Sequence, residues 1–159
     1  MAGTATPATT LLTKRRITFQ LHPYRVSPDT PDYGAAVAAA LGVAAEQVFK
    51  TLVAQVDGAL AVGVVPVTGE LDLKALAVAL GGKRAVLADR VLAERTTGYV
   101  RGGISPIGQR KRLPTVLDAS AQRYADVYVS AGRRGLQLSI APDDLAAVAD
   151  ARFAPIATH

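Results

Sequence analysis

The amino-acid sequence predicts an α+β domain with a mixed or antiparallel sheet. The chain has 159 residues, which is close to the length of one typical domain. Strand-like and helix-like segments are mixed along the chain, and no repeat, linker or low-complexity block divides them. Some neighbouring strands are joined by tight turns, for example at Asp57-Gly58. Such turns favour antiparallel pairing over a doubly wound parallel sheet.

Helices are expected where capping residues bound a helix-forming run. Thr6 followed by Pro7 is typical of a helix N-terminus, and Asp72 and Asp89 each precede another such run. Gly42 is suited to end a helix. On this basis, helices are predicted over 7–14, 33–41, 73–80, 90–96 and 142–149, with a further helical turn over 44–47.

Strands are expected where apolar residues alternate with polar ones or form short runs. The segment 17–21 alternates, whereas 59–67 is apolar on both faces and is therefore expected to be a central strand. Further strands are predicted over 48–56, 84–87, 115–117, 127–130 and 136–140. Prolines at 23, 28 and 31 predict an irregular loop that carries His22 and Tyr24.

Composition excludes several kinds of site and protein class. The chain has no cysteine and only two histidines, His22 and His159, so disulfides, thiol nucleophiles, zinc–thiolate sites and a three-histidine metal site are excluded. His22 is expected to be structural. Half of the residues are hydrophobic and 19% are charged, which argues against disorder. No apolar stretch approaches the ~20 residues that cross a bilayer, and residues 1–13 lack the order of a secretory signal, so a cytoplasmic protein is expected.

A glycine-rich segment over 98–108 is the densest local signal. It has four glycines in eleven residues and no helical period. Such a loop can direct several backbone N–H groups toward an anion or an oxyanion. A structural crossover with tight turns is an equally good interpretation. The pattern is neither a dinucleotide-binding fingerprint nor a Walker loop, so it does not indicate a mononucleotide site.

Positive charge is the second feature with functional meaning. Lys50 lies within an apolar strand, on the face of Leu52, where a lysine is costly unless an anion pairs with it or its ammonium group reaches water. The net charge is +5, and basic groups occur at 14–16, 83–84, 110–112 and 133–134. Taken singly, each group reads as ordinary charged residues at a solvated surface. Together they would form a phosphate-binding face if the fold brought them to one side.

Several segments resemble the YbaK/EbsC family of free-standing editing domains, which are related to the insertion domain of bacterial prolyl-tRNA synthetases. The segments are 49–52 (FKTL), 69–74 (GELDLK), 97–109 (TGYVRGGISPIGQ), 111–115 (KRLPT) and 128–136 (YVSAGRRGL). The match runs in order over about 7–154, and the Cys-tRNA(Pro) deacylase branch fits best. The resemblance implies one editing domain over 1–159, with a barrel-like sheet flanked by helices.

The resemblance also implies site residues. The catalytic positions are Lys50, Tyr24, Gly102 and Gly103. The substrate-binding positions are Thr51, Ile104, Ser105, Gln137, Lys111, Arg112, Arg133 and Arg134. Gln137 stands where members of the family have an aspartate. Because an amide is neutral, an acid–base or lysine-pairing role at this position is in doubt.

The implied reaction is cleavage of the ester in mischarged Cys-tRNA(Pro), in which the substrate's own thiol attacks its ester carbonyl. The expected partners are the tRNA(Pro) acceptor end and prolyl-tRNA synthetase, with no cofactor, metal or membrane. Two alternatives stay open. One is an Ala-tRNA(Pro) editing hydrolase that uses an enzyme-positioned water. The other is a non-catalytic module that binds tRNA or a synthetase.

Overall fold

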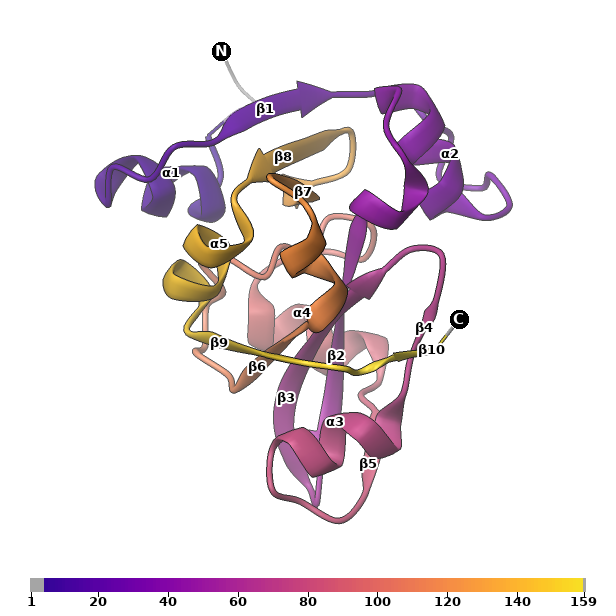
Figure 1. Cartoon of the computed structure of the whole chain (residues 1–159), viewed down its shortest axis with the longest axis vertical. Coiled ribbons are helices and arrows are strands. Elements are labelled where there is room, and N and C mark those ends of the chain that lie inside the picture. Colours follow the sequence, from indigo (N-terminus) through magenta and orange to yellow (C-terminus); the bar gives the residue numbers. More distant parts are fainter. Residues whose placement is uncertain (1–4, 159) are drawn as a thin grey trace.

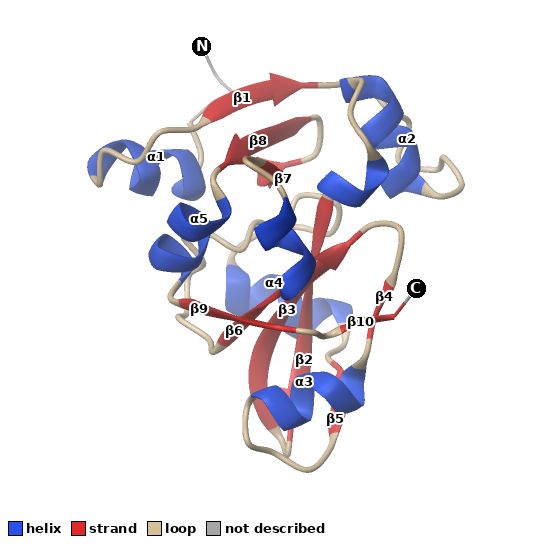
Figure 2. Ribbon diagram, in the orientation of Figure 1, coloured by secondary structure: helices blue, strands red, loops and turns tan. Residues whose placement is uncertain are grey.

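Helices and strands alternate irregularly in the computed structural model, which describes residues 5–158 (Figures 1 and 2). The helices are α1 (Pro7–Lys14), α2 (Tyr33–Leu41), α3 (Leu73–Ala79), α4 (Arg90–Thr97) and α5 (Pro142–Ala149), with 3-10 turns η1 (Ala45–Gln47) and η2 (Ala119–Arg123). The strands are β1 (Gln20–Pro23), β2 (Phe49–Val56), β3 (Ala59–Pro66), β4 (Glu70–Leu71), β5 (Ala85–Leu87), β6 (Thr115–Asp118), β7 (Val127–Arg133), β8 (Leu136–Ile140), β9 (Ala151–Ala154) and β10 (Ala157–Thr158). The predicted α+β class is confirmed.

The largest sheet has five strands in the order β5-β2-β3-β6-β9. Strands β2 and β3 pair antiparallel along their whole length, from Phe49 opposite Pro66 to Val56 opposite Ala59. The turn between them has φ of 49° at Asp57 and 84° at Gly58, as a tight hairpin requires. Strand β6 pairs parallel with both β3 and β9. The sheet is therefore mixed, and β3 is a central strand, as predicted.

Strands β1, β8 and β7 form a second, antiparallel sheet, and β4 pairs with β10. The two larger sheets are joined in the described part of the chain by one isolated bridge, between Val48 and Tyr128. Residues 5–158 therefore contain no closed barrel, and the barrel-like arrangement that was expected is open. Closure would need a continuous ladder of hydrogen bonds between neighbouring strands, and a single bridge does not provide one.

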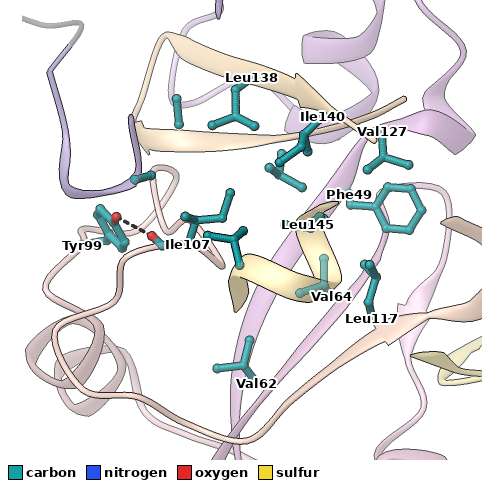
Figure 3. Packing of buried hydrophobic residues seen from close by; sticks show 14 of the residues in the cluster. Phe49, Val62, Val64, Tyr99, Ile107, Leu117, Val127, Leu138, Ile140 and Leu145 are labelled. Carbon is teal, nitrogen blue, oxygen red and sulfur yellow. Dashed lines mark hydrogen bonds between the residues drawn. The ribbon is translucent and has the colours of Figure 1, made fainter. Parts of the chain in front are cut away.

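The main core lies between the two larger sheets. Figure 3 shows Phe49 of β2, Val64 of β3 and Leu117 of β6 near Leu138 and Ile140 of β8. Leu145 of α5 joins the same cluster. A second cluster lies beneath α3, where Leu76 packs with Val65, Val116 and Ile156. Complete burial of a side chain such as Leu76 contributes about 1.5–3 kcal/mol, so these clusters hold the sheets and helices together.

Several helix caps that the sequence predicts are present. The Thr6 hydroxyl accepts a hydrogen bond from the Thr9 N–H (3.1 Å) in a reciprocal capping box. The Asp72 and Asp89 carboxylates cap α3 and α4 in the same way. No helix over 5–158 is both long enough and apolar enough to cross a membrane.

The first strand differs from the prediction. It spans Gln20–Pro23 rather than 17–21, so His22 lies in a strand and not in a loop. The reason is tertiary, because β8 is the partner strand and Gln137 lies opposite His22. Pro23 closes this edge strand, a position where the missing N–H costs little. The short strands β4, β9 and β10 also escape prediction, since each depends on a partner distant in sequence.

A buried carboxylate fixes the C-terminal segment to β6. Asp118 Oδ1 accepts hydrogen bonds from the N–H groups of Ile156 (2.9 Å) and Ala157 (3.1 Å), and Oδ2 accepts from Ser120. Asp118→Ala is expected to lower the free energy of unfolding by about 2–4 kcal/mol, because buried N–H groups lose a charged acceptor. Urea denaturation measures this change. The exposed Asp126→Ala is the control and should stay within about 0.5 kcal/mol of the parent; an equal loss in both variants would contradict the assignment.

Candidate active site

A pocket of about 400 Å³ lies where β2 begins. Strand β5 pairs with β2 only over Ala54–Val56, so among residues 5–158 the first half of β2 has no strand ladder on that side, and only Val48, just before β2, bridges to β7. Four consecutive residues of this uncovered half, 49–52, line the pocket, and α2, β4 and the glycine-rich loop complete its walls. The lining residues are Asp32, Tyr33, Gly34, Val37, Val48, Phe49, Lys50, Thr51, Leu52, Val67, Glu70, Arg101, Gly102, Ile104, Ser130 and Gln137.

The mouth of the pocket has charged side chains. Lys50 Nζ lies 3.3 Å from Glu70 Oε2, with the Lys50 side chain 30% exposed and that of Glu70 80% exposed. A lysine on an apolar strand is expected to pair with an anion, and in the structure the Glu70 carboxylate is that anion. A pair this exposed contributes only about 0–1 kcal/mol. A competing anion can therefore displace Glu70 from Lys50 at small cost.

Two buried oxygen atoms line the same pocket without a hydrogen-bond partner. They are Thr51 Oγ1 on β2 and Gln137 Oε1 on β8, which are the buried side-chain atoms of residues 5–158 found in this state. By contrast, Ser139, two residues further along β8, bonds through its hydroxyl to His22 Nε2 (2.8 Å). An unpaired buried polar atom costs about 1–3 kcal/mol. Two such atoms facing one pocket indicate a site shaped for a polar ligand.

Tyr24 does not line the pocket but contacts a residue that does. Its hydroxyl lies 3.0 Å from the hydroxyl of Tyr33. Burial, followed by the hydrogen bond to Tyr24, raises the pKa of Tyr33 to about 12. Tyr33 is therefore a neutral phenol at physiological pH, able to donate a hydrogen bond but not to act as a base.

The glycine-rich loop divides into residues that face the pocket and residues that anchor the loop. Gly102 and Ile104 line the pocket, whereas Gly103 and Ser105 do not. A Cβ at Gly103 would lie 2.6 Å from the Cα of Arg133, so no side chain fits there. Ser105 is fully buried and its hydroxyl accepts from the Ile107 N–H (3.2 Å). The loop is thus both a structural crossover and one wall of the pocket.

The buried Tyr99 anchors the loop from the other side. Its hydroxyl donates to the Ile107 carbonyl at 2.6 Å, the contact drawn in Figure 3. Burial raises the pKa of Tyr99 far above its usual range, which keeps the phenol protonated as the donor.

The basic groups are not gathered on one side. Arg134 lies next to the pocket, in an adjoining hollow, and the guanidinium of Arg133 donates to the Arg134 carbonyl (3.0 Å). Arg112 lies elsewhere, paired with Asp150 at 3.2 Å, and Lys111 is an exposed neighbour of Arg112. The 83–84 pair adjoins the β2–β3 turn, at the end opposite α2 in Figure 1.

Several lining residues were not among the predicted site residues. Asp32, Tyr33 and Gly34 come from the start of α2, and no local pattern marks them. Glu70 and Arg101 lie inside the segments that carry the family resemblance, 69–74 and 97–109. Their charge within those segments was the sequence signal for a place in the site.

Comparison with known proteins decides the family. The model of a family described as "Aminoacyl-tRNA editing domain" matches residues 27–148. This chain belongs to that family. A protein of Enterococcus faecalis named "Putative Cys-tRNA(Pro)/Cys-tRNA(Cys) deacylase EbsC" is 44% identical over 124 residues, which cover 77% of this chain and 75% of the relative. The match to the editing domain includes the pocket residues on α2, β2, β7 and β8 and in the glycine-rich loop.

Solved structures share the fold of this editing domain. A crystal structure of "a putative trans-editing enzyme for prolyl tRNA synthetase" has a TM-score of 0.85 at 23% identity, covering 100% of this chain and 99% of that one. The crystal structure of a hypothetical protein, APE2540, has a TM-score of 0.84 at 23% identity, covering 96% and 100%. These likenesses establish the architecture of the chain.

The unpaired oxygen of Thr51 has a consequence for stability. Thr51→Val removes a buried hydroxyl that has no partner and is expected to raise the free energy of unfolding by about 1 kcal/mol. Thr115→Val is the matched control on the same sheet, because Thr115 is also buried and its hydroxyl donates to the Leu113 carbonyl (3.0 Å). That variant should lose about 1 kcal/mol. Denaturation in urea compares them, and a loss of stability in both would contradict the interpretation.

Proposed function

We propose that this editing domain clears mischarged Cys-tRNA(Pro) by cleaving its aminoacyl ester in trans. The observation that carries the proposal is the pocket, whose apolar walls enclose the unpaired oxygens of Thr51 and Gln137 and whose mouth holds Lys50. A small polar side chain of the substrate fits the bottom of this pocket, and a negatively charged nucleotide fits its entrance. The family and the name of the Enterococcus faecalis relative support the same substrate.

The reaction follows from the side chains that are available. The protein has no cysteine, and its His22 is bonded to Ser139 outside the pocket. The proposed nucleophile is therefore the substrate's own thiol. Its sulfur forms a bond to the ester carbonyl carbon, and the bond from that carbon to the ribose oxygen breaks. The thiol proton passes to the ribose oxygen, which gives free tRNA and a cyclic thioester. The domain contributes orientation and charge stabilisation.

Five of the expected site residues have a place in this scheme. Lys50 exchanges Glu70 for an oxygen of the tRNA 3′ end, and the backbone of Gly102 faces the ester. Thr51 and Gln137 contact the aminoacyl group at the bottom of the pocket. Tyr24 is a positioning residue that acts through Tyr33. In this proposal the whole chain is one editing domain that acts in the cytoplasm.

The same unpaired oxygens also favour a second reaction. Thr51 Oγ1 and Gln137 Oε1 are able to hold a water molecule, and a held water is the nucleophile that an Ala-tRNA(Pro) hydrolase would need. The two reactions differ in whether the substrate requires a thiol.

Serine provides the test of the nucleophile. We expect Ser-tRNA(Pro), which is nearly isosteric with Cys-tRNA(Pro), to be deacylated at least tenfold more slowly, because a hydroxyl is a much weaker nucleophile than a partly ionised thiol. Single-turnover rates on both substrates and on Ala-tRNA(Pro) measure this difference. Equal rates on serine and cysteine would replace the thiol mechanism with the held water, and no deacylation of any substrate would leave a binding module.

Lys50 provides the test of the site. Lys50→Ala should lower kcat/KM for Cys-tRNA(Pro) by tenfold or more, which corresponds to at least ~1.4 kcal/mol of transition-state stabilisation. Lys74→Ala, an exposed lysine on α3 outside this pocket, is the matched control and should retain the parent rate. Circular dichroism checks that both variants fold. A parental rate in folded Lys50→Ala would remove Lys50 from the site.

We further propose that prolyl-tRNA synthetase supplies tRNA identity. Lys50, Gly102 and Gln137 line the proposed acceptor-end pocket, whereas Arg112 lies elsewhere on the surface, paired with Asp150. Addition of the synthetase in trans should therefore increase deacylation of Cys-tRNA(Pro) more than deacylation of a short acceptor helix. Measurement of both rates with and without the synthetase tests this partnership.

A further inference from the structure

A second hollow, of about 430 Å³, adjoins the proposed active site. The two cavities share Tyr33, Arg101 and Gly102, which form the ridge between them. The second hollow also has Arg90 and Arg134 in its wall. A ligand whose end occupies the first pocket would therefore extend its next chemical group into the second hollow.

Arg134 is held in place at this ridge. Its Nε donates to the Arg101 carbonyl at 2.9 Å. A Cβ on Gly102 would lie 2.6 Å from that Nε, so the arginine side chain packs directly on the glycine. Within residues 5–158 the two terminal nitrogens of the Arg134 guanidinium make no hydrogen bond, although the charge of Arg134 acts on the nearby Glu94 carboxylate. A planar guanidinium with one edge anchored is prepared to bind two oxygens of an anion.

The charges around the hollow leave an excess of positive charge. Three arginines, Arg90, Arg101 and Arg134, line the hollow together with one acidic residue, Asp29. The neighbouring Glu94 carboxylate is already engaged, since it accepts from the Arg101 N–H (2.8 Å) and pairs with Arg90 Nε (3.5 Å). The site therefore favours an anion that is compact and has several oxygens, which is the chemistry of a phosphate group.

We propose that this hollow binds the phosphate on the 5′ side of the terminal nucleoside of the aminoacylated RNA, with Arg134 as its principal contact. The proposal rests on the proposed function. The aminoacyl group enters the first pocket, the terminal ribose crosses the ridge of Tyr33 and Gly102, and the phosphate reaches Arg134. The contact carries no base specificity, because it reads the RNA backbone.

Two stable analogues that differ by one phosphate test the proposal. The first is 3′-amino-3′-deoxyadenosine acylated with cysteine through an amide, which cannot be cleaved as an ester. The second is the same compound with a 5′-phosphate. We expect the full chain to bind the phosphorylated analogue about tenfold more tightly in calorimetry, as one charge-assisted bidentate contact predicts.

Variants assign that difference to a residue. Arg134→Ala should abolish the advantage of the phosphorylated analogue and leave the dissociation constant of the other unchanged. Arg134→Lys, which keeps the charge but loses the planar pair of donors, should retain only part of the advantage. Arg123→Ala, an exposed arginine outside both cavities, is the matched control and should behave as the parent.

Each outcome is decisive. Equal binding of the two analogues by the parent, or equal weakening of both by Arg134→Ala, overturns the phosphate site while the proposed function stands. If neither analogue binds, the proposed function fails and the phosphate site fails with it. Inorganic phosphate is the last arm, and we expect it to compete only at far higher concentration than the phosphorylated analogue. Competition at equal concentration would make this a site for free phosphate and overturn the proposal.

Discussion

The close contact between Gly103 and the backbone of Arg133 positions the glycine-rich loop, which forms a wall of both cavities. At this point the glycine-rich loop lies against the end of β7 with no space for a side chain. The contact places Gly102 and Ile104 in the wall of the pocket and brings Arg134 onto the ridge. A side chain at position 103 would force the loop away from β7 by about the width of a methyl group. Both cavities would then open, since this loop forms a wall of each.

An incomplete sheet creates the space that the loop encloses. Strand β5 covers β2 only near its end, and the bridge to β7 is made by Val48, just before β2 begins. The first half of β2 is thus free to present Lys50 and Thr51 to a ligand. A buried oxygen without a partner, such as that of Thr51, is expected to cost stability in the free protein, and a ligand that bonds to it would recover this free energy on binding. The same atom is therefore expected to lower the stability of the free protein and to favour ligand binding.

Charge varies from the mouth of the pocket to its base. Lys50 and Glu70 form an exposed pair at the mouth, whereas Gln137 is neutral and buried. The resemblance drawn from the sequence implies an acidic residue where this chain has Gln137. In the structure Gln137 lines the pocket and presents a neutral amide there. A mechanism in which the substrate supplies the nucleophile does not require a charge at this position.

The local elements of this protein were determined by the sequence itself. The caps at Thr6, Asp72 and Asp89 and the turn at Asp57-Gly58 act over a few residues, so the order of residues specifies them. Tertiary structure alone decided the register of β1, the short strands β4, β9 and β10, and the convergence of Tyr33, Glu70 and Gln137 on one pocket. Those features depend on contacts between segments that are distant along the chain. Their free energy arises only when the two sheets pack, and no local pattern records it.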